Sequence, residues 1–174
     1  MGKDNFILIE EGASLHDVTI RIRGNNNLIV FGKECYVGKN CSFWMEGNNI
    51  SICIGEKSTF THSVHFCAQE DNSKITVGND CMFSNNIIVR TSDSHPIYNI
   101  DTSVRINEAK SVNIGDHVWI APNSKIMKGV SIGAGTIIGS DSMVTRDIPS
   151  NVLAVGHPAK VVKEKIKWTR EDVF

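Results

Sequence analysis

Aliphatic residues recur every six positions in the last third of the chain. Six residues spaced in this way each begin a hexapeptide unit: Ile114, Ile120, Ile126, Ile132, Ile138 and Val144. This period fits neither the 3.6-residue turn of a helix nor the alternation of a simple strand. It is typical of short strands joined by turns in a coil with three flat sides. The pattern therefore predicts an all-β fold, a parallel β-helix of hexapeptide repeats.

The earlier part of the chain repeats with a longer period. Gly24–Glu46, Gly47–Gln69 and Glu70–Ser92 align as three blocks of equal length, each with three hexapeptides and an extra stretch rich in Asn and Gly. One glycine follows the first apolar residue of every block, where we expect the chain to turn a corner at positive φ. These glycines are Gly32, Gly55 and Gly78.

The hexapeptide period stops after Val89 and resumes at Ile114. A solenoid tolerates such an insertion because each coil contacts only its neighbours. Loops of this length in a compact domain are usually functional. We therefore divide a single domain, 1–174, into three parts and a terminal helix. The parts are long-period coils at 1–92, an active-site loop at 93–111 and regular hexapeptide coils at 112–150.

The last residues depart from the repeat. Val161, Val162 and Ile166 are spaced for the apolar face of a short amphipathic helix. We predict a C-terminal α-helix over 159–170 that covers the unpaired edge of the final coil.

Composition excludes several classes of partner. With 41% hydrophobic residues and a net charge of -1, the chain has no long-range attraction for nucleic acid or an anionic membrane. The longest apolar runs, such as Phe6–Ile9, are too short for a membrane span. We expect a cytoplasmic protein without a stable membrane anchor. The cysteines include no CxxC pair, which indicates neither a disulfide framework nor a thiolate zinc site.

His95 stands at the base of the loop that interrupts the repeat, before Pro96. A histidine is well suited to accept a proton near neutral pH, provided that its ring is held in a fixed orientation. The plain alternative is a surface histidine in a polar loop. Two further residues flank the loop in sequence: the polar Asn86 in the repeat before it and the aromatic Trp119 in the repeat after it. Together they make the loop base a candidate active site.

Three segments carry a resemblance to a known family. They read SDSHP, IGDHVWIAPNSKIMKGVSIGAGTIIGSDSMVTRDIP and AVGHPAKVVKEKI. In these segments the chain resembles the hexapeptide-repeat acyltransferases, and among them the maltose, galactoside and xenobiotic acetyltransferases and their polysaccharide O-acetyltransferase relatives. The resemblance implies a left-handed coil, an exception to the usual right-handed crossover.

The resemblance also implies an activity, acetyl transfer from acetyl-CoA to a sugar hydroxyl of a surface glycan, a polysaccharide or its precursor. His95 would act as general base for direct attack of the hydroxyl on the thioester. Asn86 would orient the acceptor or stabilise the oxyanion, and Trp119 would lie along the pantetheine arm. No metal is implied. Coenzyme A would further contact residues of the later coils and the C-terminal segment: Ala121, Gly139, Ser140, Thr145, Arg146, Pro158, Lys160 and Lys163.

Members of this family are usually homotrimers with active sites between subunits, so we expect His95 of one subunit to meet Trp119 of a neighbour. Asp93, Tyr98 and Arg105 of the loop are expected to contact the acceptor or the subunit interface.

Three other functions remain open. An amino-sugar N-acetyltransferase would share the same donor chemistry. A γ-carbonic-anhydrase-like metal enzyme would use histidines as ligands, although the registers of the candidates disagree with one another: His62, His65, His95 and His117. A non-catalytic β-helix scaffold would bind no acetyl-CoA.

Overall fold

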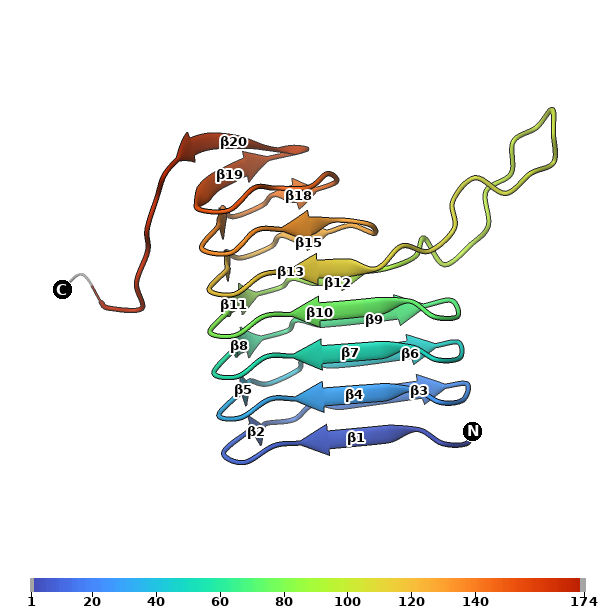
Figure 1. Ribbon diagram of the computed structural model, residues 1–174, viewed down its shortest axis with the longest axis horizontal. Helices are drawn as coiled ribbons and strands as arrows, with labels where there is room; N and C mark the ends of the chain where they lie inside the picture. The colour runs from blue at the N-terminus through green and yellow to red at the C-terminus, as the bar shows by residue number, and fades with distance from the viewer. Residues whose placement is uncertain (1, 173–174) are drawn as a thin grey trace.

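The protein is a stack of coils built from short strands in three sheets (Figure 1). The computed structural model describes residues 2–172. Each coil passes once through every sheet, and neighbouring strands of a sheet come from successive coils. The predicted all-β parallel β-helix is therefore confirmed.

The strands are distributed as follows. Sheet A contains β1 (Phe6–Ile9), β4 (Leu28–Phe31), β7 (Ser51–Ile54), β10 (Lys74–Val77), β13 (Val112–Ile114) and β16 (Ser131–Ile132). Sheet B contains β2 (Ser14–Leu15), β5 (Tyr36–Val37), β8 (Thr59–His62), β11 (Met82–Asn85), β14 (Trp119–Ile120), β17 (Ile137–Ile138), β19 (Val152–Gly156) and β20 (Ala159–Glu164). Sheet C contains β3 (Thr19–Arg23), β6 (Ser42–Glu46), β9 (His65–Gln69), β12 (Ile88–Arg90), β15 (Lys125–Ile126) and β18 (Met143–Val144). We call the turns between them the A/B, B/C and C/A corners.

The register of the strands follows both sequence periods. Phe43 on β6 lies opposite Phe66 on β9, one long period later in the chain. Ile120 on β14 lies opposite Ile138 on β17, three hexapeptides later. The longer period lengthens the strands that meet at the C/A corner, since β6 and β7 are both longer than β15 and β16.

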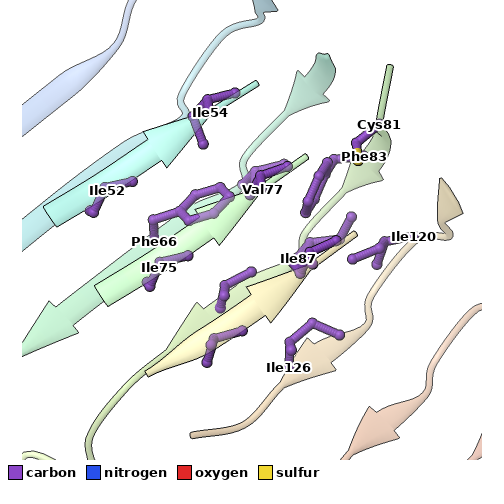
Figure 2. Close-up of a cluster of buried hydrophobic side chains, with 14 of the residues drawn as sticks. Ile52, Ile54, Phe66, Ile75, Val77, Cys81, Phe83, Ile87, Ile120 and Ile126 are labelled. Atoms are coloured by element: carbon purple, nitrogen blue, oxygen red, sulfur yellow. The ribbon is translucent and has the colours of Figure 1, made fainter. Parts of the chain in front are cut away.

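Stacked phenylalanines fill the middle of the core. The rings of Phe43 and Phe66 are 5.1 Å apart between centroids and nearly parallel, and those of Phe60 and Phe83 are 4.6 Å apart. All four side chains are fully buried. Figure 2 shows Phe66 and Phe83 among the isoleucines of sheets A and C and of the B/C corner. Because the paired residues are one coil apart, identical side chains stack on each other and the ladder connects successive coils.

Replacing Phe66 by alanine should lower the free energy of unfolding by about 3–5 kcal/mol, because loss of the fully buried ring leaves a cavity next to three other phenylalanines. Urea unfolding followed by circular dichroism measures this loss. Phe6→Ala is the matched control, because Phe6 is 65% exposed and its loss should cost less than about 1 kcal/mol. Equal losses for the two variants would contradict the proposed role of the ladder.

The regular spacing of Gly32, Gly55 and Gly78 has a different cause from the predicted one. None of the three is among the glycines at positive φ. A Cβ at Gly78 would instead lie 2.4 Å from Oδ1 of Asp116 on the next coil, and one at Gly32 would lie 2.8 Å from the carbonyl oxygen of Ile54. Close stacking of successive A/B corners excludes a side chain at these positions.

The predicted C-terminal helix over 159–170 is wrong. Ala159–Glu164 forms β20, which pairs antiparallel with β19 after the turn at Gly156. β19 would otherwise present an unpaired edge, and the β-branched Val161 and Val162 suit a strand. These two valines are 37% and 54% exposed, so they form no buried helical face. No helix occurs in residues 2–172, and thus none there could cross a membrane.

The segment after β20 runs back beside the A/B corners of earlier coils (Figure 1). The Trp168 ring stacks on His117 at 3.9 Å between centroids, and its Nε1 donates to the His117 carbonyl oxygen at 3.0 Å. Arg170 donates to Asp80 at 2.7 Å and to Thr59 at 3.0 Å, one and two coils further back. This segment therefore fastens the last coils to the middle of the stack.

Candidate active site

His95 lies at the base of a long loop that leaves the stack at the C/A corner, between Arg90 at the end of β12 and Val112 at the start of β13 (Figure 1). The His95 carbonyl oxygen accepts a hydrogen bond from Nδ2 of Asn107 at 2.9 Å. Its side chain is exposed and forms no hydrogen bond with other side chains in residues 2–172. The backbone is thus fixed, while the imidazole is available to a ligand.

An ion pair holds the two arms of the loop against the stack. The guanidinium of Arg105 donates twice to the Glu70 carboxylate, at 2.7 Å for each bond. Ser92 donates to the same carboxylate at 2.6 Å. Hydrogen bonding to Arg105 lowers the pKa of Glu70 to about 2. We expected Arg105 to contact the acceptor or a subunit interface. Its contacts within the chain instead support a role in holding the loop in place.

A second ion pair lies next to His95. Lys128, at the C/A corner of the following coil, donates to Oδ2 of Asp93 and to the Asn107 carbonyl oxygen, the latter at 2.8 Å. Asn107 Nδ2 also donates to Asp93, at 3.0 Å. The hydrogen bond from Lys128 lowers the pKa of Asp93. Asp93 is therefore ionised and already paired within the chain, and Lys128 links its carboxylate to the Asn107 carbonyl oxygen on the returning arm of the loop.

Tyr98 lies further out on the loop, where it forms an antiparallel bridge with Arg105. Its side chain is 58% exposed. It is free to contact an acceptor or a second subunit.

Acidification should loosen this loop. A carboxylate whose pKa is depressed by folding stabilises the fold above its ordinary pKa and loses that contribution as the pH falls towards the depressed value. For Glu70 the window runs from about 4.5 down to about 2, and Asp93 acts in the same direction. Hydrogen exchange of residues 97–106, corrected for intrinsic rates, should rise across this window. Glu70→Gln should show fast exchange already at neutral pH; slow exchange in that variant would contradict the assignment.

Trp119 lies on β14 in sheet B, with its side chain partly buried. Its Nε1 atom is buried without a hydrogen-bond partner within residues 2–172. The Trp168 ring lies 5.9 Å away between centroids and shields one side of the indole. A buried N–H without an acceptor is costly, so this atom is suited to a ligand that supplies one.

Asn86 lies at the B/C corner with φ of 56°. Its Nδ2 donates to Oδ1 of Asn123 at 3.2 Å, and Asn123 donates in turn to Asp141 at 3.1 Å. These contacts form a ladder of polar corner residues. They do not link Asn86 to His95 within the chain.

The three predicted catalytic residues occupy different parts of one stack. The C/A corner, which carries His95, lies opposite sheet B, which carries Trp119, and Asn86 lies at a third position. One chain therefore does not bring them together.

Four of the residues expected to contact coenzyme A do come together. Thr145, Arg146, Pro158 and Lys160 line a hollow of about 500 Å³ between the last C/A corner and the β19–β20 turn. Within residues 2–172, Arg146 and Lys160 form no salt bridge. Asp147 also lines the hollow, where its carboxylate accepts a hydrogen bond from the Ser131 amide at 2.7 Å. Two cations beside one carboxylate leave a positive charge that suits an anionic group such as a phosphate.

The other expected coenzyme contacts are spread over neighbouring positions. Ala121 and Gly139 lie on adjacent coils at the B/C corner, where the Ala121 amide donates to the Ile138 carbonyl at 2.8 Å. Ser140 follows Gly139 there, and a Cβ at Gly139 would lie 2.5 Å from Val155. Lys163 lies on β20 opposite Leu153, outside the hollow.

The sequence prediction missed the anchors of the loop: Glu70, Asn107 and Lys128. One signal was available, since Glu70 replaces the glycine that begins the two preceding blocks. The histidines proposed as alternative metal ligands do not cluster. In the described part of the chain, no three His, Cys, Asp or Glu side chains are grouped closely enough to hold a metal ion.

The chain is similar in sequence to known transferases. Residues 111–146 match the model of the bacterial transferase hexapeptide family (six repeats). The polysialic acid O-acetyltransferase of Escherichia coli O1:K1 / APEC is 41% identical over 92 residues, which are 53% of this chain and 30% of that protein. The matches thus span less than half of the curated relatives.

Solved structures match over more of the chain. The polySia-specific acetyltransferase NeuO gives a TM-score of 0.92 at 35% identity, covering 99% of this chain and 72% of that one. The polysialic acid O-acetyltransferase OatWY gives a TM-score of 0.80 at 29% identity, covering 99% of this chain and 92% of that one.

Proposed function

Because the chain belongs to the hexapeptide-repeat acetyltransferases, we propose that it transfers acetyl groups from acetyl-CoA to hydroxyls of a sialic acid polymer or a closely related acidic glycan. The observation that carries this proposal is the similarity to NeuO, at 35% identity over 99% of the chain. The exposed His95 imidazole and the unpartnered Trp119 N–H supply the groups that the chemistry needs.

His95 acts as general base. An imidazole nitrogen accepts the proton of the acceptor hydroxyl as its oxygen attacks, and the same nitrogen returns the proton to the departing thiolate. Acetyl-CoA supplies an already activated thioester, so no acyl-enzyme is needed. Asn107 holds the His95 backbone by donating to its carbonyl oxygen, and the same amide donates to Asp93.

The chain's own residues fit coenzyme A at two places. Trp119 offers its buried Nε1–H as a donor, and its indole forms an apolar wall for the pantetheine arm. The cations of Arg146 and Lys160 bind phosphate in the hollow beside Pro158.

The remaining expected contacts divide into two groups. Ala121, Gly139 and Ser140 form the path between the indole and the hollow, where small side chains leave room for a long ligand. The proposed roles of Lys163 in coenzyme binding and of Asn86 in catalysis have less support. Lys163 lies outside the hollow, and the Asn86 amide already donates to Asn123.

A homotrimer completes the site. The loop with His95 leaves the C/A corner, opposite sheet B of its own chain, which supports the proposal that a neighbouring chain supplies Trp119. A closed ring of identical subunits satisfies every site in the same way.

Incubation with acetyl-CoA and a sialic acid polymer tests the function. We expect release of free CoA matched by ester-linked acetyl groups on the polymer, detected by mass spectrometry and removed by mild base. Calorimetry should show binding of CoA. Acetyl groups that resist base and lie on an amine would instead indicate an N-acetyltransferase. No CoA binding at millimolar coenzyme would indicate a scaffold.

A further inference from the structure

The outward face of sheet C carries one straight row of side chains below the loop. Arg21 lies opposite Trp44, Trp44 opposite Cys67, and Cys67 opposite Arg90, each on the next coil. Stacked strands are separated by about 4.8 Å, so the row is about 14 Å long. It leads from the first coils to the base of the loop that carries His95.

Cationic and aromatic side chains both lie on this face. The Arg21 guanidinium carbon lies 5.0 Å from the centroid of the Trp44 ring. The rings of Trp44 and His65 are 4.9 Å apart and perpendicular, and Nδ1 of His65 lies 2.7 Å from Oγ of Ser42. Cys67 is only 7% exposed, so Trp44 and Arg90, which are both partly exposed, supply the accessible surface of this part of the row.

Arg90 forms the upper end of the row. Its Nε donates to the Ser92 carbonyl oxygen at 2.6 Å and its Nη2 to Oγ of Ser94 at 3.0 Å. Ser94 directly precedes His95. No carboxylate of residues 2–172 forms a salt bridge with Arg90, and its Nη1 has no hydrogen-bond partner there. One side of this guanidinium is thus available to an outside anion.

The charge of the face is positive although the whole chain has a net charge of -1. Arg21 and Arg23 lie 3.7 and 3.5 Å from one carboxylate, that of Glu46. With Arg90, three guanidinium groups and one carboxylate lie on the outward face of these strands, and Asp93, the carboxylate near Arg90, is paired with Lys128. Glu46 also accepts a hydrogen bond from Gln69 at 2.7 Å, so its charge is already shared.

We propose that this row, Arg21, Trp44, Cys67 and Arg90, binds successive carboxylated sugar units of the acidic acceptor and delivers one hydroxyl to His95. The guanidinium groups pair with carboxylates, which they recognise through two parallel hydrogen bonds. A sugar ring packs its C–H face on the Trp44 indole. The inference rests on the proposed function, because it assigns the acceptor side of the same site.

Acceptor binding without acetyl-CoA tests the row directly. Sialic acid oligomers of increasing length should bind the wild-type protein more tightly until they span the row, and added salt should weaken binding. Trp44→Ala and Arg21→Gln should each lower the affinity for long oligomers by about ten-fold. Their KM for acetyl-CoA should not change. Lys74→Gln, which removes an exposed charge from sheet A, should bind as the wild type does.

Several outcomes would overturn the proposal. One is unchanged affinity for the oligomers in both variants, and another is equally tight binding of a neutral dextran. A third is a change in the oligomeric state of the variants, measured by light scattering, because this would assign the face to contacts between subunits. The two proposals fail separately. Acetyl transfer that is insensitive to Trp44→Ala and Arg21→Gln removes only the binding row, whereas length-dependent binding without acetyl transfer removes only the proposed activity.

Discussion

Replacing His95 by alanine is expected to lower kcat for acetyl transfer by about 10²- to 10⁴-fold, the usual contribution of a positioned general base. The side chain is exposed and forms no hydrogen bond within residues 2–172, so its loss creates neither a cavity nor an orphaned polar group. The thermal unfolding midpoint and the affinity for CoA should therefore stay at wild-type values. Release of free CoA in the presence of the acceptor measures the rate.

His16→Ala is the matched control for this variant. His16 is also exposed, but it lies far down the stack next to Tyr36. It should keep full activity. If His95→Ala retained more than about a tenth of the wild-type kcat, general-base catalysis by His95 would be excluded.

Mixing two inactive variants is expected to restore activity. If each site takes His95 from one subunit and Trp119 from the next, His95→Ala and Trp119→Ala subunits complement each other in a mixed ring. Random assembly of equal amounts should give about a quarter of the wild-type activity, since half of the sites receive an intact His95 and half of these an intact Trp119. The topology motivates this test, because the C/A corner lies opposite sheet B in one chain.

The complementation experiment requires subunit exchange, achieved by mild unfolding and refolding of the mixture. Each variant refolded alone, and the two mixed without exchange, should remain inactive. Isotope labelling of one variant lets mass spectrometry detect the mixed oligomers. If mixed oligomers form but remain inactive, a site shared between subunits is refuted. An active monomer would do the same.

The stack of coils was predictable because its signal is repeated. Each aliphatic residue from Ile114 to Val144 confirms the same hexapeptide period, so one irregular unit does not obscure it. The end of the chain gives no such repetition. Val161, Val162 and Ile166 fit a helical face by spacing, but the free edge of β19 decided their structure, and a pattern of so few residues contains no information about that edge.

The candidate site was predictable only in part, for a related reason. The break in the period located the loop and His95. The anchors were not found because the contact of Glu70 with Arg105 joins residues distant in sequence and depends on how the loop folds back. The row on sheet C could have been found, since Arg21, Trp44, Cys67 and Arg90 are each one long period apart.

The long-period coil also acts as a unit of length. Since successive coils pair in a fixed register, one more coil between β6 and β9 would move Arg21 away from His95 by about 4.8 Å and leave the Glu70 and Asp93 ion pairs in place. If the proposed row binds the acceptor, the number of coils below the loop sets, in discrete steps, the length of acceptor that spans it. On that proposal, duplication of a coil would change the selectivity for polymer size without any change at His95.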